Sequence, residues 1–269
     1  MAWAGLSASW EKWDSIIMGQ LAPVGEAMIE RLGSMRHQHH LDVASGTGEP
    51  GISVAKAAPE GRIVLTDLSA EMLAVASRRA QAQGVRNVTT AVCSADALPF
   101  EDGTFDSITV RFGYMFFPDP AGATSELVRV LRPGGRRCSS VWVKPEDNPW
   151  TTIAMQAIGT EVQVPPPDEN GPNMYRCARP GYVSALYEQA HLTDVHEWDV
   201  PLELVTQSPD QFWETISDHV SLVAATLRRV DEPARTRIRS VAMTAVVAFD
   251  VGGEIRVPGM ARCIVGTKR

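Results

Sequence analysis

The 269-residue sequence has no excess of basic charge, because 25 Lys and Arg residues stand against 32 Asp and Glu residues, a formal net charge of −7. A protein that binds nucleic acid by neutralising phosphates usually carries a basic excess or a basic stripe, and no long Lys/Arg run supplies one. This balance argues against nucleic acid as a partner.

Long apolar runs are also absent, since none reaches the roughly 18 residues of a membrane span. Residues 1–13 lack the basic and apolar regions of a signal peptide. We therefore expect no membrane span and a cytoplasmic location. The four cysteines lie far apart, without a CxxC pair or a closely spaced histidine. They are expected to be buried thiols, and no metal site is predicted.

The remaining composition, with 44% hydrophobic residues, suits a globular protein of one large domain or a core with a subdomain. Residues 1–35 form the first of three stretches, a helical cap in which tryptophans and aliphatic residues recur at intervals of three, four and seven. Pro23 is expected to divide this cap into two helices.

Residues 36–150, the second stretch, alternate β-branched apolar runs with amphipathic segments. We expect strands at residues 40–44, 62–66, 88–92, 105–111 and 136–143, and helices at residues 51–58, 69–84 and 121–131. This alternation predicts an α/β fold with parallel strands and helices on both faces.

Residues 151–269, the third stretch, are less regular, and their proline-rich part at residues 164–173 predicts an extended loop. A helix at residues 182–190 and strands at 195–205 and 254–267 are expected. Residues 208–250, predicted to form helices at 208–230 and 233–249, are named the lid segment. We expect this stretch to supply the remaining core strands and the substrate side.

A glycine loop is the most informative motif. Gly46, Gly48 and Gly51 fit GxGxxG between a strand and a helix, and Asp67 follows 21 residues after Gly46. This pattern suits a dinucleotide, but two cofactors would satisfy it. A pyrophosphate at a helix N-terminus disfavours an acid inside the loop, where Glu49 lies. Acids around the loop suit a cationic ligand such as S-adenosylmethionine better.

Four segments in order carry a more specific resemblance. They are Leu41-Asp42-Val43-Ala44-Ser45-Gly46-Thr47-Gly48, Thr66-Asp67-Leu68-Ser69-Ala70-Glu71-Met72-Leu73, Ala95-Asp96-Ala97-Leu98-Pro99-Phe100, and Phe105-Asp106 with Leu131-Arg132-Pro133-Gly134-Gly135. Together they resemble the class I S-adenosylmethionine-dependent methyltransferases, type 11, the subgroup similar to ubiquinone and menaquinone C-methyltransferases. The resemblance covers about residues 40–143. It implies a Rossmann-like seven-stranded sheet with the last strand antiparallel, an N-terminal helical segment and a helical lid.

The resemblance also implies a set of cofactor-binding residues: Ala44, Ser45, Gly46, Gly48, Asp67, Leu68, Met72, Asp96, Ala97, Arg111 and Phe112. In this set Asp67 accepts hydrogen bonds from the ribose hydroxyls, and Leu68 and Met72 pack against adenine. Asp96 receives the adenine amine, and Ala97 offers its amide. Simpler roles compete with some of these. Asp96 could cap a turn, Met72 could be core, and Asp42 could order the loop amides.

Two residues are candidates for chemistry on the acceptor. Methyl transfer from a sulfonium depends mostly on alignment, but a hydroxyl or acidic carbon that loses a proton needs a base. His219 shares an apolar helical face with Phe212 and Ile216, so it points either into core or into a substrate cavity. Tyr114 could orient an acceptor hydroxyl. Aromatic side chains of the cap, Trp10 and Trp13, are expected in the acceptor pocket.

The sequence thus predicts methyl transfer to an oxygen or carbon of a small acceptor that is aromatic, quinone-like or polyketide-like. Three alternatives stay open. The first is an NAD-dependent oxidoreductase, and the second is a cyclase or binding protein of the same fold that keeps the cofactor without transferring a methyl group. The third is methyl transfer to a protein or RNA acceptor. The oligomeric state and the atom methylated are not encoded in any motif.

Overall fold

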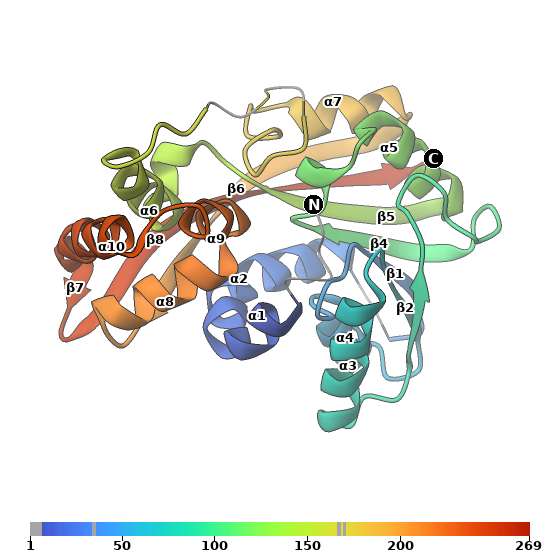
Figure 1. Ribbon diagram of the computed structural model, residues 1–269. Helices are drawn as coiled ribbons and strands as arrows, with labels where there is room; N and C mark the ends of the chain where they lie inside the picture. Colours follow the sequence, from blue (N-terminus) through green and yellow to red (C-terminus); the bar gives the residue numbers. More distant parts are fainter. Residues whose placement is uncertain (1–6, 34–35, 166–167, 169–170) are drawn as a thin grey trace.

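The computed structural model describes residues 7–33, 36–165, 168 and 171–269, and in them one sheet organises the molecule. Its strands are β1 (His39–Val43), β2 (Arg62–Asp67), β3 (Val88–Val92), β4 (Phe105–Arg111), β5 (Leu131–Trp142), β6 (Leu192–Thr206), β7 (Asp250–Val251) and β8 (Glu254–Lys268). The order is β3-β2-β1-β4-β5-β8-β6, and β7 pairs only with β8 (Figure 1).

The strand directions confirm the predicted fold class. The pairs from β3 to β5 are parallel, whereas β8 runs antiparallel to both of its neighbours, β5 and β6. The two-residue strand β7 adds a short hairpin to the seven strands that were expected. Parallel strands bring their carboxyl ends to one edge, where open α/β sheets bind ligands.

Helices surround the sheet. They are α1 (Ser7–Lys12), α2 (Asp14–Leu32), α3 (Gly51–Ala57), α4 (Ala70–Ala82), α5 (Pro120–Val130), α6 (Pro149–Gly159), α7 (Tyr182–Gln189), α8 (Pro209–His219), α9 (Ser221–Leu227) and α10 (Glu232–Val246). Figure 1 shows α1 between α4 and α8, with α9 and α10 beyond α8. The helices α8 to α10 lie in sequence between β6 and β8.

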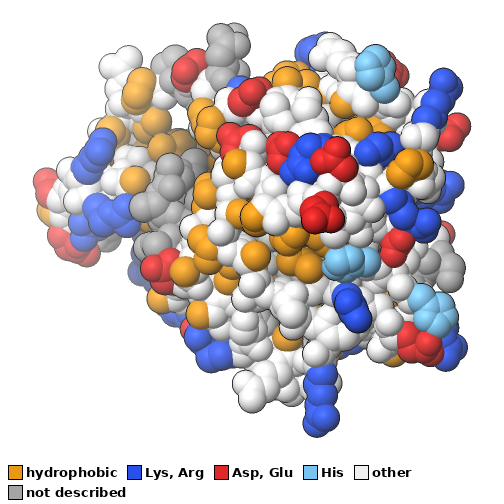
Figure 2. All heavy atoms as spheres, turned by 90° about the vertical axis from the view of Figure 1, so that its right-hand side faces the viewer, with side chains coloured by type: hydrophobic (Ala, Val, Ile, Leu, Met, Phe, Trp, Pro, Cys, Tyr) orange, Lys and Arg blue, Asp and Glu red, His pale blue; other side chains and the backbone are white. Residues whose placement is uncertain are grey.

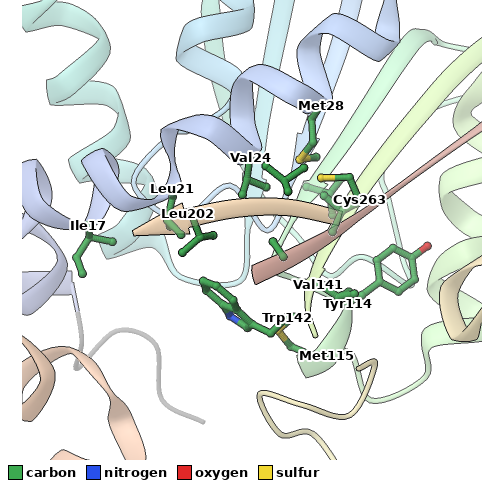
Figure 3. Packing of buried hydrophobic residues seen from close by; sticks show 14 of the residues in the cluster. Ile17, Leu21, Val24, Met28, Tyr114, Met115, Val141, Trp142, Leu202 and Cys263 are labelled. Atoms are coloured by element: carbon green, nitrogen blue, oxygen red, sulfur yellow. The ribbon is translucent and has the colours of Figure 1, made fainter. Parts of the chain in front are cut away.

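The N-terminal cap corrects one prediction. Pro23 lies inside α2 and does not divide it, because the break between helices falls at Trp13. The apolar face of α2, with Ile17, Leu21 and Val24, packs toward β6 and β8 (Figure 3), and this packing continues across the proline. Trp3 lies outside the described residues.

The third stretch differs from expectation at two places. Residues 208–230 form two helices that meet at Val220, not one. Helix α6, which no prediction included, begins at Pro149 directly after the Asn148 turn. Its residues Trp150, Ile153 and Ala154 are buried, so a helical pattern was present but short.

The sequence also predicts properties of the surface charges, the helices and the cysteines. On the face shown in Figure 2, basic and acidic side chains are interspersed, and the described residues there form no continuous basic area. No helix among the described residues has the length and apolar character needed to cross a bilayer. Within the same residues no group of three or more His, Cys, Asp or Glu side chains is placed to hold a metal ion. The four cysteines are free thiols, and Cys93 alone is partly exposed.

Candidate cofactor and substrate site

The carboxyl ends of β1 and β4 carry backbone strain. Ala44 follows β1 with a φ of 53°, and Phe112 follows β4 with a φ of 56°. The left-handed region costs a residue with a Cβ about 1–2 kcal/mol. Such conformations gather at functional sites, where the surrounding structure holds them. Here they turn the chain away from two neighbouring strand ends, at the edge of the sheet expected to bind the ligand.

The three glycines of the loop serve different purposes. At Gly46, with a φ of 52°, an added Cβ would meet open space, so this backbone faces the crevice. At Gly48 a Cβ would lie 2.6 Å from Ile52, and at Gly51 it would lie 2.2 Å from Leu65. Gly46 therefore leaves room for a ligand, whereas Gly48 makes room for Ile52 of α3 and Gly51 lets α3 pack closely on Leu65 of the sheet.

Asp42 lies beneath this loop and touches no open space. It is fully buried, and its Oδ2 accepts the Gly51 amide at 2.9 Å. The Thr109 hydroxyl donates to its Oδ1 at 2.7 Å, and His40 Nε2 lies 2.9 Å from the same hydroxyl. Asp42 thus orders the loop amides, the simpler of the two roles considered for it.

Burial favours the neutral forms of the two titratable groups in this chain of hydrogen bonds. It raises the pKa of Asp42 to about 7 and lowers the pKa of His40 to about 3. The His40 ring lies inside the sheet and links the Ser107 hydroxyl to the Thr109 hydroxyl. The alternation of His40 and Asp42 along one strand was the available signal, since residues two apart share a face.

Asp67, at the end of β2, holds the neighbouring turn. Its Oδ2 accepts the Gly46 amide and its Oδ1 accepts the Ser69 amide, each at 2.9 Å. Each carboxylate oxygen keeps a further lone pair for a ligand hydroxyl. Burial raises the pKa of Asp67, while these amide bonds oppose that change.

The residues predicted to contact adenine divide into two groups. Leu68 is 63% exposed and offers an apolar surface, and Asp96 is exposed as well. Met72 is 2% exposed and covered by protein, so the structure supports its packing role and not a contact with adenine. The Ala97 amide already donates to the Ser94 carbonyl at 3.2 Å, which closes the turn after β3.

Arg111, at the end of β4, is the cation of the site. Its Nη2 lies 3.6 Å from the Met18 sulfur, and no carboxylate of the described residues lies within ion-pair distance. The acids that act on it from farther away are Glu49 and Asp42, and burial lowers its pKa. The next residue, Phe112, stacks on Trp142 at 4.1 Å.

Arg79, on helix α4, connects the N-terminal cap to the glycine loop. No sequence motif indicated this residue. Its Nη1 donates to the Thr47 carbonyl at 2.7 Å, and its Nη2 lies 3.3 Å from Asp14 Oδ2. The other oxygen, Asp14 Oδ1, is buried and has no hydrogen-bond partner. Asp14 also feels the charges of Glu49 and Arg111, so α2 begins above the strand ends.

Helices α1 and α8 meet at a contact that we name the α1–α8 seam, formed by Ser9, Trp10, Trp13, Asp218 and His219. The Trp10 and His219 rings meet edge to face at 4.3 Å. Asp218 accepts the Trp13 indole N–H at 3.0 Å and pairs with Lys12 at 2.7 Å. His219 thus lies beside the cap, within a contact between helices and not inside the sheet core.

The structure disagrees with the acceptor role predicted for Tyr114. This residue is fully buried, and its hydroxyl lies 2.8 Å from the Thr124 hydroxyl and bonds to the Arg137 guanidinium. Both partners belong to the face of the sheet that α5 and α7 cover, where Arg137 lies 4.3 Å over the Tyr187 ring. The hydroxyl is satisfied inside the protein and has no side open to an acceptor.

Comparison with known proteins places this geometry in a family. The model of the ubiE/COQ5 methyltransferase family matches residues 9–156. A demethylmenaquinone methyltransferase of Thermus thermophilus is 45% identical over 96 residues, 36% of this chain and 43% of that protein. A ubiquinone/menaquinone biosynthesis C-methyltransferase of Marinomonas is 40% identical over 108 residues, 39% of this chain and 43% of that protein. The chain thus matches somewhat less than half the length of these curated relatives.

Solved structures share the whole architecture. The YcgJ protein of Bacillus subtilis aligns with 91% of this chain and 97% of its own, with a TM-score of 0.57 and 22% identity. The [4+2]-cyclase SpnF aligns with 91% of this chain and 80% of its own, with a TM-score of 0.56 and 20% identity. At these identities the likeness shows the fold alone. From the matched residues 9–156, more than half of its length, the chain belongs to the ubiE/COQ5 methyltransferase family.

Proposed function

We propose that this protein transfers a methyl group from S-adenosylmethionine to an oxygen or carbon of a small aromatic, quinone-like acceptor. One observation carries the proposal: three groups follow one another across neighbouring strand ends. Asp67 ends β2, the open space at Gly46 follows β1, and Arg111 ends β4. Family membership and the names of the matched relatives support the same activity.

The chemistry of these three groups fits the cofactor part by part. Asp67 keeps lone pairs for the two ribose hydroxyls, and Gly46 lets backbone approach the ligand. Arg111 is a partly buried guanidinium without a carboxylate at ion-pair distance among the described residues, so it suits the carboxylate of a methionine group. Glu49 lies in the same region, and its carboxylate acts on Arg111 and suits an ammonium and a sulfonium.

When bound, S-adenosylmethionine supplies the methyl group on a sulfonium. The protein residues then have to hold the acceptor in line and exclude water, since alignment provides most of the rate. Helix α2 of the cap would exclude water from the crevice, because Arg79 links Asp14, at the start of α2, to the glycine loop. Leu68 would cover the adenine side with its exposed apolar surface.

His219 is proposed to orient the acceptor. Burial lowers its pKa to about 4, so the imidazole is neutral near pH 7. A group with so low a pKa is a weak base, because general bases work best with a pKa near the working pH. A hydrogen bond to an acceptor hydroxyl therefore suits it better than full proton transfer. His219→Gln should lower methyl transfer and leave cofactor affinity unchanged, and near-normal turnover would remove the role.

The activity is tested with purified protein in two measurements. Calorimetry with S-adenosylmethionine and with NADH should show binding of the first only, and preferential NADH binding would favour the oxidoreductase. Mass spectrometry after incubation with 1,4-dihydroxynaphthalene, the reduced form of 1,4-naphthoquinone, should show S-adenosylhomocysteine accumulating together with the methylated product. Bound cofactor that is never converted, with this probe or with a panel of phenols, would contradict the proposal.

A further inference from the structure

The α1–α8 seam contains polar atoms that the protein leaves unpaired. Among the described residues, Trp10 Nε1, His219 Nδ1 and Ser9 Oγ are buried and have no hydrogen-bond partner. Leaving a buried donor or acceptor unpaired costs about 1–3 kcal/mol. Two of these atoms belong to rings in contact at 4.3 Å. Unpaired groups that gather at one place call for a ligand that pairs them.

A second tryptophan of the same seam shows that pairing is available there. Trp13 lies three residues after Trp10, and its indole N–H donates to Asp218 at 3.0 Å. Asp218 directly precedes His219 in α8, so the two residue pairs of the seam are adjacent. The seam therefore pairs the indole N–H of Trp13 from within the protein and leaves the N–H of Trp10 unpaired.

Trp10 also lies about one helical turn before Asp14, a residue at the edge of the cofactor crevice. Asp14 follows it by four residues, which places the two side chains on one face of nearly continuous helix. Asp14 ion-pairs with Arg79, which binds the glycine loop, and it lies in the field of Arg111. The spacing therefore places Trp10 within about one helical turn of the groups that surround the cofactor crevice.

We propose that Trp10 is a substrate-positioning residue, whose indole N–H and the His219 imidazole together bind one hydroxyl group of the acceptor. The inference rests on the proposed methyl transfer and adds where the acceptor is held. An indole N–H only donates, and a neutral imidazole nitrogen can accept. A hydroxyl accepts from the first and donates to the second, so it pairs both. A flat aromatic ring bearing that hydroxyl would lie against the two rings.

The test uses protein saturated with S-adenosylhomocysteine and three probes measured by calorimetry. 1-Naphthol can accept and donate, 1-methoxynaphthalene can only accept, and naphthalene can do neither. In the unmodified protein we expect 1-naphthol to bind about 10- to 100-fold more tightly than naphthalene, with 1-methoxynaphthalene between them, as two modest hydrogen bonds imply. Equal affinities, or no binding by any probe, would overturn the proposal.

Trp10→Phe and Trp13→Phe form the matched pair of variants. Trp10→Phe removes an unpaired donor, so we expect no loss of thermal stability, unchanged naphthalene affinity and loss of most of the 1-naphthol preference. Trp13→Phe removes a paired donor, so it should lower thermal stability and keep that preference. The opposite assignment of effects would overturn the role of Trp10.

Failure of this inference can be told apart from failure of the proposed function. S-Adenosylmethionine affinity and S-adenosylhomocysteine formation are measured on the same preparations. Normal values with a 1-naphthol preference that survives Trp10→Phe would reject the Trp10 site alone. Absence of cofactor binding in the unmodified protein would reject the methyltransferase proposal itself.

Discussion

The cofactor side of the crevice and the α1–α8 seam treat their polar groups in opposite ways. Around the glycine loop, Asp42 and Asp67 each accept two hydrogen bonds from the protein, so their positions are set before any ligand binds. In the seam, Trp10 and His219 contact each other while a nitrogen of each stays unpaired. The cofactor side is therefore formed before its ligand binds, whereas the α1–α8 seam needs a ligand to pair its polar atoms.

The two sides are also fastened differently. The loop is held by backbone amides and by Arg79, whose side chain is only 17% exposed. Helix α1 is held by ion pairs whose side chains are about half exposed, Lys12 with Asp218 of α8 and Glu11 with Arg78 of α4. Buried polar contacts resist salt and motion more than exposed ion pairs do. The comparison therefore predicts that disrupting the cofactor side has the larger effects.

The largest effect is expected from Asp67→Ala. The variant removes the acceptor for two ribose hydroxyls and leaves the Gly46 and Ser69 amides unpaired. Two hydrogen bonds to a charged group are worth about 3 kcal/mol together, so S-adenosylmethionine affinity should fall at least roughly 100-fold. Calorimetry measures this. Asp102→Ala, an exposed surface acid paired with Arg129, is the control and should bind normally. Affinity within threefold of normal in Asp67→Ala would end the ribose assignment.

The next effect concerns pH and the buried pair Asp42 and His40. Between about pH 4 and 6.5 the unfolded chain holds one proton on His40, and the folded protein holds one on Asp42, whose pKa is about 7. The raised Asp42 pKa alone makes stability fall as pH rises from about 4 to 7. The lowered His40 pKa alone makes stability fall as pH drops from 6.5 toward 3. The two slopes cancel in the unmodified protein.

Removing one partner should expose the slope of the other. In Asp42→Asn, the free energy of unfolding relative to the unmodified protein should fall by about 1.4 kcal/mol per pH unit as pH drops from 6.5 to 4. His40→Asn is the mirror control, and its stability should instead fall as pH rises through this window. Urea unfolding at four pH values measures both. Stability profiles parallel to that of the unmodified protein would show that folding does not shift the pKa values of Asp42 and His40 in opposite directions.

The cofactor side was largely predictable from sequence, and the reason is local chemistry. The strands 88–92 and 105–111 were placed without error because their β-branched runs are bounded by turns. The glycine spacing and Asp67 follow from what a tight turn at a strand end requires. Sequence could not decide between the adenine and core roles of Met72, because helical spacing does not tell a ligand-facing side chain from a core one, and the structure buries this residue.

The seam and the cap were not predictable in the same way, because they depend on contacts between distant segments. A proline inside a helix normally interrupts it, but at Pro23 the packing of α2 on the sheet outweighs that tendency. The pairing of Trp13 with Asp218 joins residues 205 positions apart. Tyr114 was expected near the acceptor from its position after β4, and only the structure shows its hydroxyl turned to Arg137.

A smaller effect than the first two is expected from Arg79→Met, which cuts the cap from the glycine loop. The guanidinium donates to the Thr47 carbonyl and pairs with Asp14, and methionine preserves the apolar stem. We expect the free energy of unfolding to fall by about 1–3 kcal/mol, since the partners are partly buried. S-Adenosylmethionine affinity should fall with it, because the cap no longer closes on the loop. Unchanged affinity would mean that α2 does not cover the cofactor.

The smallest effect is expected one residue earlier, from Arg78→Met. Its ion pair with Glu11 at 2.9 Å joins α4 to α1, but both side chains are more than half exposed. Exposed pairs contribute about 0.2–1 kcal/mol, and salt screens them. Urea unfolding at low and at about 1 M salt should show a small loss that disappears at high salt. Because Arg78 and Arg79 are neighbours on one helix, a larger or salt-resistant loss at Arg78 would reverse the comparison, since an exposed ion pair of α1 would then hold the cap more firmly than the contacts at the glycine loop do.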